Sequence, residues 1–62
     1  MKQIVVGMKV TPARPMGILK DGVVLRIDPK SNTAGVMWKL EDGLLTSTVP
    51  LQNLVEVVEN EQ

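Results

Sequence analysis

Signals for tight turns recur at intervals of about ten residues along this 62-residue chain. Each signal combines Gly, Pro, Asn, Asp or Ser, which supply a positive φ, a fixed φ or a side chain that caps its own backbone. The signals lie at residues 11–17, 20–22, 28–32 and 41–43. Only short elements fit between them, so the spacing predicts an all-β barrel or sandwich and supports no helix.

The segments between these turns alternate apolar and polar residues, which is the pattern of a half-buried strand. In residues 22–28, one face carries Val23, Leu25 and Ile27. In residues 33–40, one face carries Ala34, Val36, Trp38 and Leu40. We predict that these two faces form the core, and that the opposite faces point to solvent. The outward-facing residues are then Val24, Arg26 and Asp28 in the first segment and Gly35, Met37 and Lys39 in the second.

The predicted architecture is a five-stranded barrel with strands over residues 4–10, 22–28, 33–40, 44–49 and 54–58. A hairpin turn at Asp42-Gly43 joins the third strand to the fourth. Pro50 cannot donate to a central ladder, so it ends the fourth strand, and a short 3₁₀ turn is expected before the last strand. Residues 1–58 form the single domain, and residues 59–62 are expected to fray as an acidic tail.

Composition removes most catalytic chemistry from consideration. The chain has no Cys and no His, so it lacks a structural zinc site, a disulfide and any thiol or imidazole catalyst. The acidic residues do not recur at the spacing of an oxygen-ligand metal site. We therefore predict that the protein is not an enzyme, and that it has no catalytic residue, cofactor or metal.

The expected compartment is the cytoplasm. No apolar run approaches the length of a membrane span, so no membrane partner is expected. The segment Met1–Gly7 holds one basic residue and only a short apolar run, which is too little for a signal peptide. The absence of Cys agrees with a reducing compartment.

The charges are unevenly distributed along the chain, although the net charge is zero. Residues 1–40 carry all seven basic side chains and two acidic ones, whereas residues 41–62 carry only acidic charges. Either folding mixes the two halves, or a basic face forms that contacts phosphates. The candidate nucleic-acid-binding residues are Lys20, Arg26, Lys30 and Lys39. A pI near 6.1 makes such binding weak and salt-sensitive.

Apolar residues outside the predicted core faces indicate a second kind of surface. Either the long first loop folds over them, or they contact another protein or a second copy of the chain. Edge strands of a small barrel also invite pairing with a second copy. The candidate partner-binding residues are Arg14, Met16, Ile18, Leu19, Val24 and Met37, with Leu44 as a further residue outside the core faces.

Several short motifs resemble those of small SH3-like barrels of the KOW-like and Tudor-like kind. The motifs are Val6-Gly7-Met8-Lys9-Val10, Gly22-Val23-Val24, Val36-Met37-Trp38 with Asp42-Gly43, and Val49-Pro50-Leu51 with Leu54. The resemblance covers nearly the whole chain and implies the barrel fold, but this scaffold serves many functions. Trp38 is expected in the core, with a binding anchor at the barrel edge as the alternative. One ring cannot form an aromatic cage for methyl-lysine.

A more distant similarity is to the plasmid-type trimethoprim-resistant dihydrofolate reductase, a tetramer of small barrels. Its pore-lining stretch corresponds here to Thr46-Ser47-Thr48-Val49 ahead of Pro50. The Gln and Tyr of that stretch are missing, so the similarity does not imply reductase activity.

Three functional hypotheses follow from the sequence. The first is a small non-catalytic module that binds another protein as an adaptor or regulatory factor, of the kind that phages and mobile elements encode. The second is a KOW-like nucleic-acid-binding domain. The third is an oligomeric enzyme whose site lies at a symmetry axis and uses Ser47 and Thr48.

Overall fold

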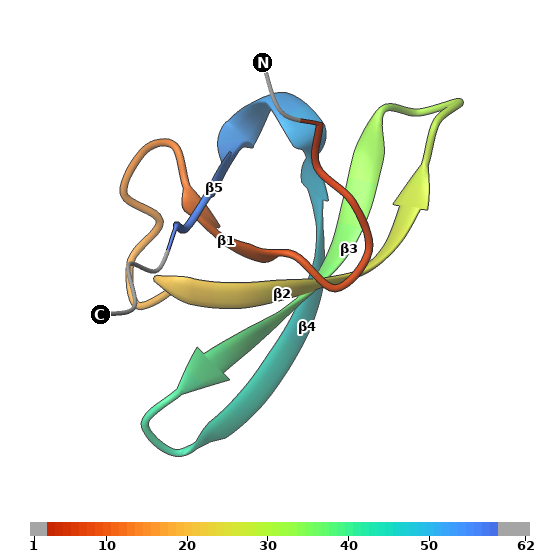
Figure 1. Ribbon diagram of the computed structural model, residues 1–62. Coiled ribbons are helices and arrows are strands. Elements are labelled where there is room, and N and C mark those ends of the chain that lie inside the picture. Colours follow the sequence, from red (N-terminus) through yellow and green to blue (C-terminus); the bar gives the residue numbers. More distant parts are fainter. Residues whose placement is uncertain (1–2, 59–62) are drawn as a thin grey trace.

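A single antiparallel sheet contains all five strands of the computed structural model, which describes residues 3–58. The strands are β1 (Lys9–Pro12), β2 (Asp21–Asp28), β3 (Thr33–Leu40), β4 (Gly43–Pro50) and β5 (Leu54–Glu56), and a 3₁₀ turn (Leu51–Asn53) precedes β5. Their order in the sheet is β4-β3-β2-β1-β5, so β4 and β5 are its two edges (Figure 1). The predicted all-β class, the number of strands and the 3₁₀ turn are confirmed. The predicted acidic tail at residues 59–62 lies outside the described residues.

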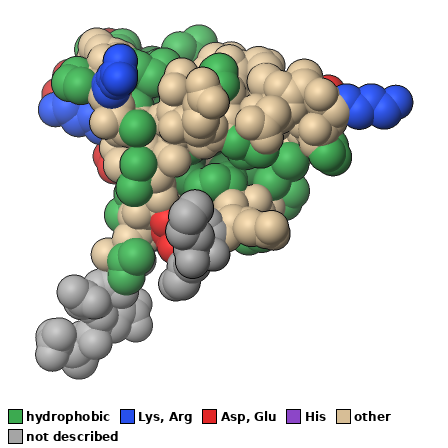
Figure 2. Space-filling model, turned by 90° about the horizontal axis from the view of Figure 1, so that it is seen from above, with side chains coloured by type: hydrophobic (Ala, Val, Ile, Leu, Met, Phe, Trp, Pro, Cys, Tyr) green, Lys and Arg blue, Asp and Glu red, His purple; other side chains and the backbone are tan. Residues whose placement is uncertain are grey.

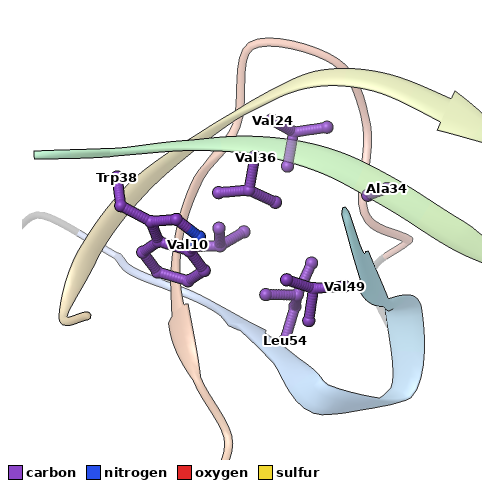
Figure 3. Close-up of a cluster of buried hydrophobic side chains, with 7 residues drawn as sticks. All are labelled: Val10, Val24, Ala34, Val36, Trp38, Val49 and Leu54. Carbon is purple, nitrogen blue, oxygen red and sulfur yellow. The ribbon is translucent and has the colours of Figure 1, made fainter. Parts of the chain in front are cut away.

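The hydrophobic core is assembled around Trp38, whose side chain is fully buried. The predicted core face of β3 is confirmed, since Ala34 and Val36 are buried beside it and Leu40 packs against the cluster. Figure 3 shows side chains from the other strands converging on this face. The buried cluster consists of Val10, Val24, Ala34, Val36, Trp38, Val49 and Leu54.

A β-bulge in β2 reverses the predicted alternation in the part of the strand that precedes it, whereas Ile27 beyond the bulge packs against the core as predicted. The ladder with β3 pairs Val24 with Val36 and then Arg26 with Gly35, so Leu25 is the extra residue. An extra residue exchanges the two faces of a strand, because side chains alternate with period two. Val24 is therefore buried at 1% exposure, whereas Leu25 is 45% exposed. The prediction that Val24 faces outward and binds a partner is wrong for this reason.

The first strand begins later than predicted. Residues 4–8 precede β1, and Gly7 adopts a positive φ of 90° in a turn that the Met8 N–H closes by donating to the Val5 carbonyl at 3.1 Å. Only Gly adopts such a φ without steric cost, so the chain turns here instead of extending. The segment still joins the sheet locally, since the Gly7 N–H donates to the Val24 carbonyl at 2.8 Å.

The end of the chain follows the predicted order with shifted bounds. Pro50 is the last residue of β4, and β5 ends at Glu56 instead of residue 58. The 3₁₀ turn is tied to two distant loops: the Leu51 N–H donates to the Asn32 carbonyl at 2.9 Å, and the Ala13 N–H donates to the Asn53 carbonyl at 2.7 Å. Within the described residues, no helix is long and apolar enough to cross a membrane.

Gly22 is required by the close approach of β2 to the Trp38 ring. A Cβ at Gly22 would lie 2.6 Å from Val36 Cγ1 and 2.7 Å from Trp38 Cε3. Gly22→Ala is expected to lower the free energy of unfolding by about 1–3 kcal/mol, because a well-packed core yields to an added methyl group only with strain. Urea unfolding followed by Trp38 fluorescence measures the loss.

Gly35→Ala is the matched control for this prediction. A Cβ at Gly35 would meet the Arg26 side chain, with Nε at 2.9 Å, and a flexible surface side chain moves aside more easily than a buried ring. The expected loss is therefore smaller than for Gly22→Ala. Equal losses for the two variants would contradict the assignment of Gly22 as the packing constraint.

Candidate functional site

The outer face of the sheet carries a row of apolar side chains that the core does not use. Met37 on β3 lies opposite Val23 on β2 and opposite Thr46 on β4. In the next row, Lys39 lies between Asp21 on β2 and Leu44 on β4. The antiparallel register therefore places an apolar strip, the side chains of Val23 and Met37, next to one acidic residue, Asp21, and one basic residue, Lys39.

This strip forms the floor of a shallow groove that crosses four strands. Val23 and Met37 are half-buried in it, whereas Leu44 is 65% exposed at its end. We call it the outer-face groove, and its lining residues are Lys9, Val10, Asp21, Gly22, Val23, Met37, Lys39, Leu44 and Val57. Of these, Met37 was a candidate from the sequence. Val23 was missed because every residue of Val23-Val24-Leu25 is apolar, so the sequence does not reveal the bulge that turns Val23 outward.

A second, polar hollow lies at the other end of the outer face, beside the β2–β3 turn. Its lining residues are Arg26, Asp28, Ser31, Thr33, Gly35 and Thr48. The Asp28 carboxylate accepts the Lys30 backbone N–H at 3.0 Å, and the hydroxyls of Ser31 and Thr33 lie 2.8 Å apart. Since Gly35 has no side chain, the Arg26 side chain lies close over the strand there. The hollow thus holds one cation and one anion, which gives it no strong preference for phosphate.

The predicted basic face is not assembled as one patch. Arg26 lies opposite Gly35, whereas Lys39 lies opposite Asp21, four residues further along β3. At about 3.3 Å per residue, this separates the two side chains by about 13 Å along the strand. Figure 2 agrees, because Lys and Arg side chains appear at opposite ends of the molecule with uncharged surface between them. Lys20 and Lys30 are exposed, in the loop before β2 and in the β2–β3 turn.

The candidate residues of the long first loop occupy different environments. Arg14 is exposed, and Ile18 is 70% exposed. Met16 and Leu19 form an isolated bridge, and Leu19 packs against the core. The loop thus folds partly over the core, which is one of the two alternatives that the sequence left open. Ile18 is its most exposed large apolar side chain.

Trp38 and Ser47 form a side-chain hydrogen bond in the interior. The Trp38 Nε1–H donates to the Ser47 Oγ at 2.9 Å. The prediction that Trp38 belongs to the core is confirmed, since a fully buried ring offers no surface to a partner. The polar centre of β4 is explained as well: Ser47 faces inward to accept this bond, while Thr46 and Thr48 face outward.

No group of three or more acidic side chains in residues 3–58 is placed to hold a metal ion. Comparisons with protein-family models, with curated proteins and with solved structures found no match. The functional proposal therefore depends on the groove, the hollow and the strand edges described above.

Replacing Ser47 tests the role of the indole hydrogen bond. Ser47→Ala leaves the Trp38 N–H without its acceptor in a part-buried position, which is expected to cost about 1–2 kcal/mol of unfolding free energy. Thr48→Ala removes an exposed hydroxyl of the same strand and is expected to change stability by about 0.5 kcal/mol or less. Thermal unfolding of the two variants provides the comparison. A neutral Ser47→Ala variant would show that the bond contributes nothing to stability.

Proposed function

We propose that this protein is a small non-catalytic module that binds an apolar segment of another protein in the outer-face groove. The observation that carries the proposal is the group of apolar side chains formed by Val23, Met37 and, in the next row, Leu44, which is partly exposed on the face of the sheet that the core does not use. Concave apolar surface on a small domain is the usual place for a partner to bind.

The charges beside the groove do not select a ligand of either sign. Lys39 and Asp21 lie opposite one another at the end where Leu44 is exposed, so one charge of each sign is present there. The apolar residues of a bound segment contact Val23 and Met37. The expected ligand is therefore an apolar stretch of protein, held as part of an adaptor or regulatory contact.

The proposed scaffold for this function is an SH3-like barrel. Three features support it: five short antiparallel strands, the 3₁₀ turn directly before the last strand, and the pairing of β5 with β1 at the edge of the sheet. The sheet of the described residues is open between β4 and β5, so full closure is not among the supporting observations.

Peptide selection tests the groove. Random peptides displayed on phage are selected on the wild-type protein, and an enriched peptide is synthesised and titrated into ¹⁵N-labelled protein. Amide shifts are expected at Val23, Met37 and Leu44. Met37→Thr is expected to weaken binding roughly tenfold or more, because a buried Met side chain contributes about 1.5–3 kcal/mol.

Ile18→Thr is the matched control, since Ile18 is an apolar loop residue that is 70% exposed and does not line the groove. The control is expected to bind the peptide as the wild type does. Peptides that bind Met37→Thr as tightly as wild type, or that shift only the loop around Ile18, would refute the groove as the binding site.

The nucleic-acid alternative is tested in the same spectra with mixed-sequence DNA and RNA at two salt concentrations. Because the basic residues are split between two ends of the face, we expect no salt-sensitive cluster of shifts. Such a cluster at Lys20, Arg26, Lys30 and Lys39, lost on charge reversal of Arg26 and Lys39, would favour the nucleic-acid-binding hypothesis instead.

A further inference from the structure

The free edge of β4 is long, uncharged and unprotected. It runs from Gly43 to Pro50 without a bulge in its pairing with β3, and no charged residue occurs in it. In the described part of the chain, no strand pairs with its outer side (Figure 1). Proteins normally protect such an edge with charges, Pro or a bulge, because its unpaired N–H and C=O groups recruit another strand. Here Pro50, at the last position, is the one such device.

Pro50 also reveals which backbone groups face the free edge. In an antiparallel ladder, residues alternate between two kinds of position. At the first kind, the backbone N–H and C=O groups bond to the neighbouring strand, and at the second kind they point away from it. Pro50 has no N–H and lies opposite Thr33, so it occupies a position of the second kind. Because the register is continuous, Leu44, Thr46 and Thr48 share that position and direct their N–H and C=O groups to the free edge.

We propose that β4 pairs antiparallel with β4 of a second copy of this chain, with Thr46 opposite its own counterpart. In this register, Leu44 of each copy lies opposite Thr48 of the other. The three edge-facing residues are symmetric about Thr46, so all of their backbone donors and acceptors are satisfied at once. Shifting the register by two residues in one direction leaves one edge-facing residue of each copy unpaired. Shifting it in the other direction places Leu44 opposite Pro50, which has no N–H to donate to the Leu44 carbonyl.

Self-pairing suits this edge better than pairing with an unrelated strand. Two identical antiparallel strands are related by a two-fold axis, so the interface is complementary to itself and closes after one pairing. The pairs of the two β4 strands on the outer face are uncharged: Thr46 with Thr46 at the axis, and Leu44 with Thr48 on either side. Asp42 then lies opposite Pro50 of the other copy, and Glu41 lies opposite Leu51 in the 3₁₀ turn, which contains no acidic residue.

Exposed apolar side chains at the same edge favour the pairing further. Leu44 is 65% exposed and Leu45 is 45% exposed, one on each face of the strand. A second copy of β4 covers part of both. The other edge of the sheet, β5, has only three residues, which is too short to offer an equivalent ladder. The proposal concerns an edge of the sheet and shares only Leu44 with the outer-face groove.

Charge variants at the symmetry axis test the proposal with sedimentation equilibrium across a concentration series. Wild-type protein is expected to dimerise. Thr46→Lys and Thr46→Asp each place two like charges opposite one another, and each is expected to raise the dimer dissociation constant roughly tenfold or more. An equimolar mixture of the two variants is expected to recover the dimer, because the charges are then opposite. Thr46→Val, which is uncharged, is expected to remain dimeric.

Two results would overturn the proposal: a wild-type protein that stays monomeric throughout the series, or a dimer that both charge variants leave unchanged. Near-UV circular dichroism of Trp38 verifies that the variants are folded. Hydrogen exchange of the wild type gives a second, substitution-free test. The amides of Leu44, Thr46 and Thr48 are expected to become protected as concentration rises, and exchange that is independent of concentration would contradict the pairing.

Discussion

The burial of the Trp38 indole is the interaction on which the rest of the fold depends. It is the one aromatic side chain of the chain, and a 62-residue domain has little other volume to bury. Its ring excludes any side chain from Gly22 on the neighbouring strand, and its N–H requires an acceptor, which Ser47 supplies from the other side. One residue of the central strand thereby determines residue types on both strands that flank it.

The bulge in β2 links this core to the proposed binding surface. On the Trp38 side of the bulge, Gly22 and Val24 face inward and Val23 faces out beside Met37. Beyond it, Ile27 packs against the core and Arg26 faces out over Gly35. A continuous alternation would have buried Val23 and exposed Val24, and the apolar strip of the outer face would have lost its centre. The irregularity thus separates an apolar end of the face from a polar one.

The two surfaces available for binding differ in their chemistry. The groove offers side chains and therefore selects a partner by shape and apolarity. The edge of β4 offers backbone groups at regular spacing, which any extended strand can match, and only its symmetry and lack of charge favour a second copy. Pairing through the edge leaves Val23 and Met37 uncovered, so a dimer would carry two grooves. Two linked copies bind a repeated or dimeric partner more tightly than one copy does.

The number of strands, the 3₁₀ turn after Pro50 and the core face of β3 could be predicted from the sequence. The hairpin between the third and fourth strands could be predicted as well, although its turn lies at Glu41-Asp42, one position earlier than predicted. All of these follow from local turn chemistry and period-two alternation. The phase of β2, the turn at Gly7 and the separation of Arg26 from Lys39 could not be predicted from the sequence. A bulge and a register depend on the partner strand, which local patterns do not reveal. In Val23-Val24-Leu25 every residue is apolar, so either face could be buried until packing against Trp38 selected one.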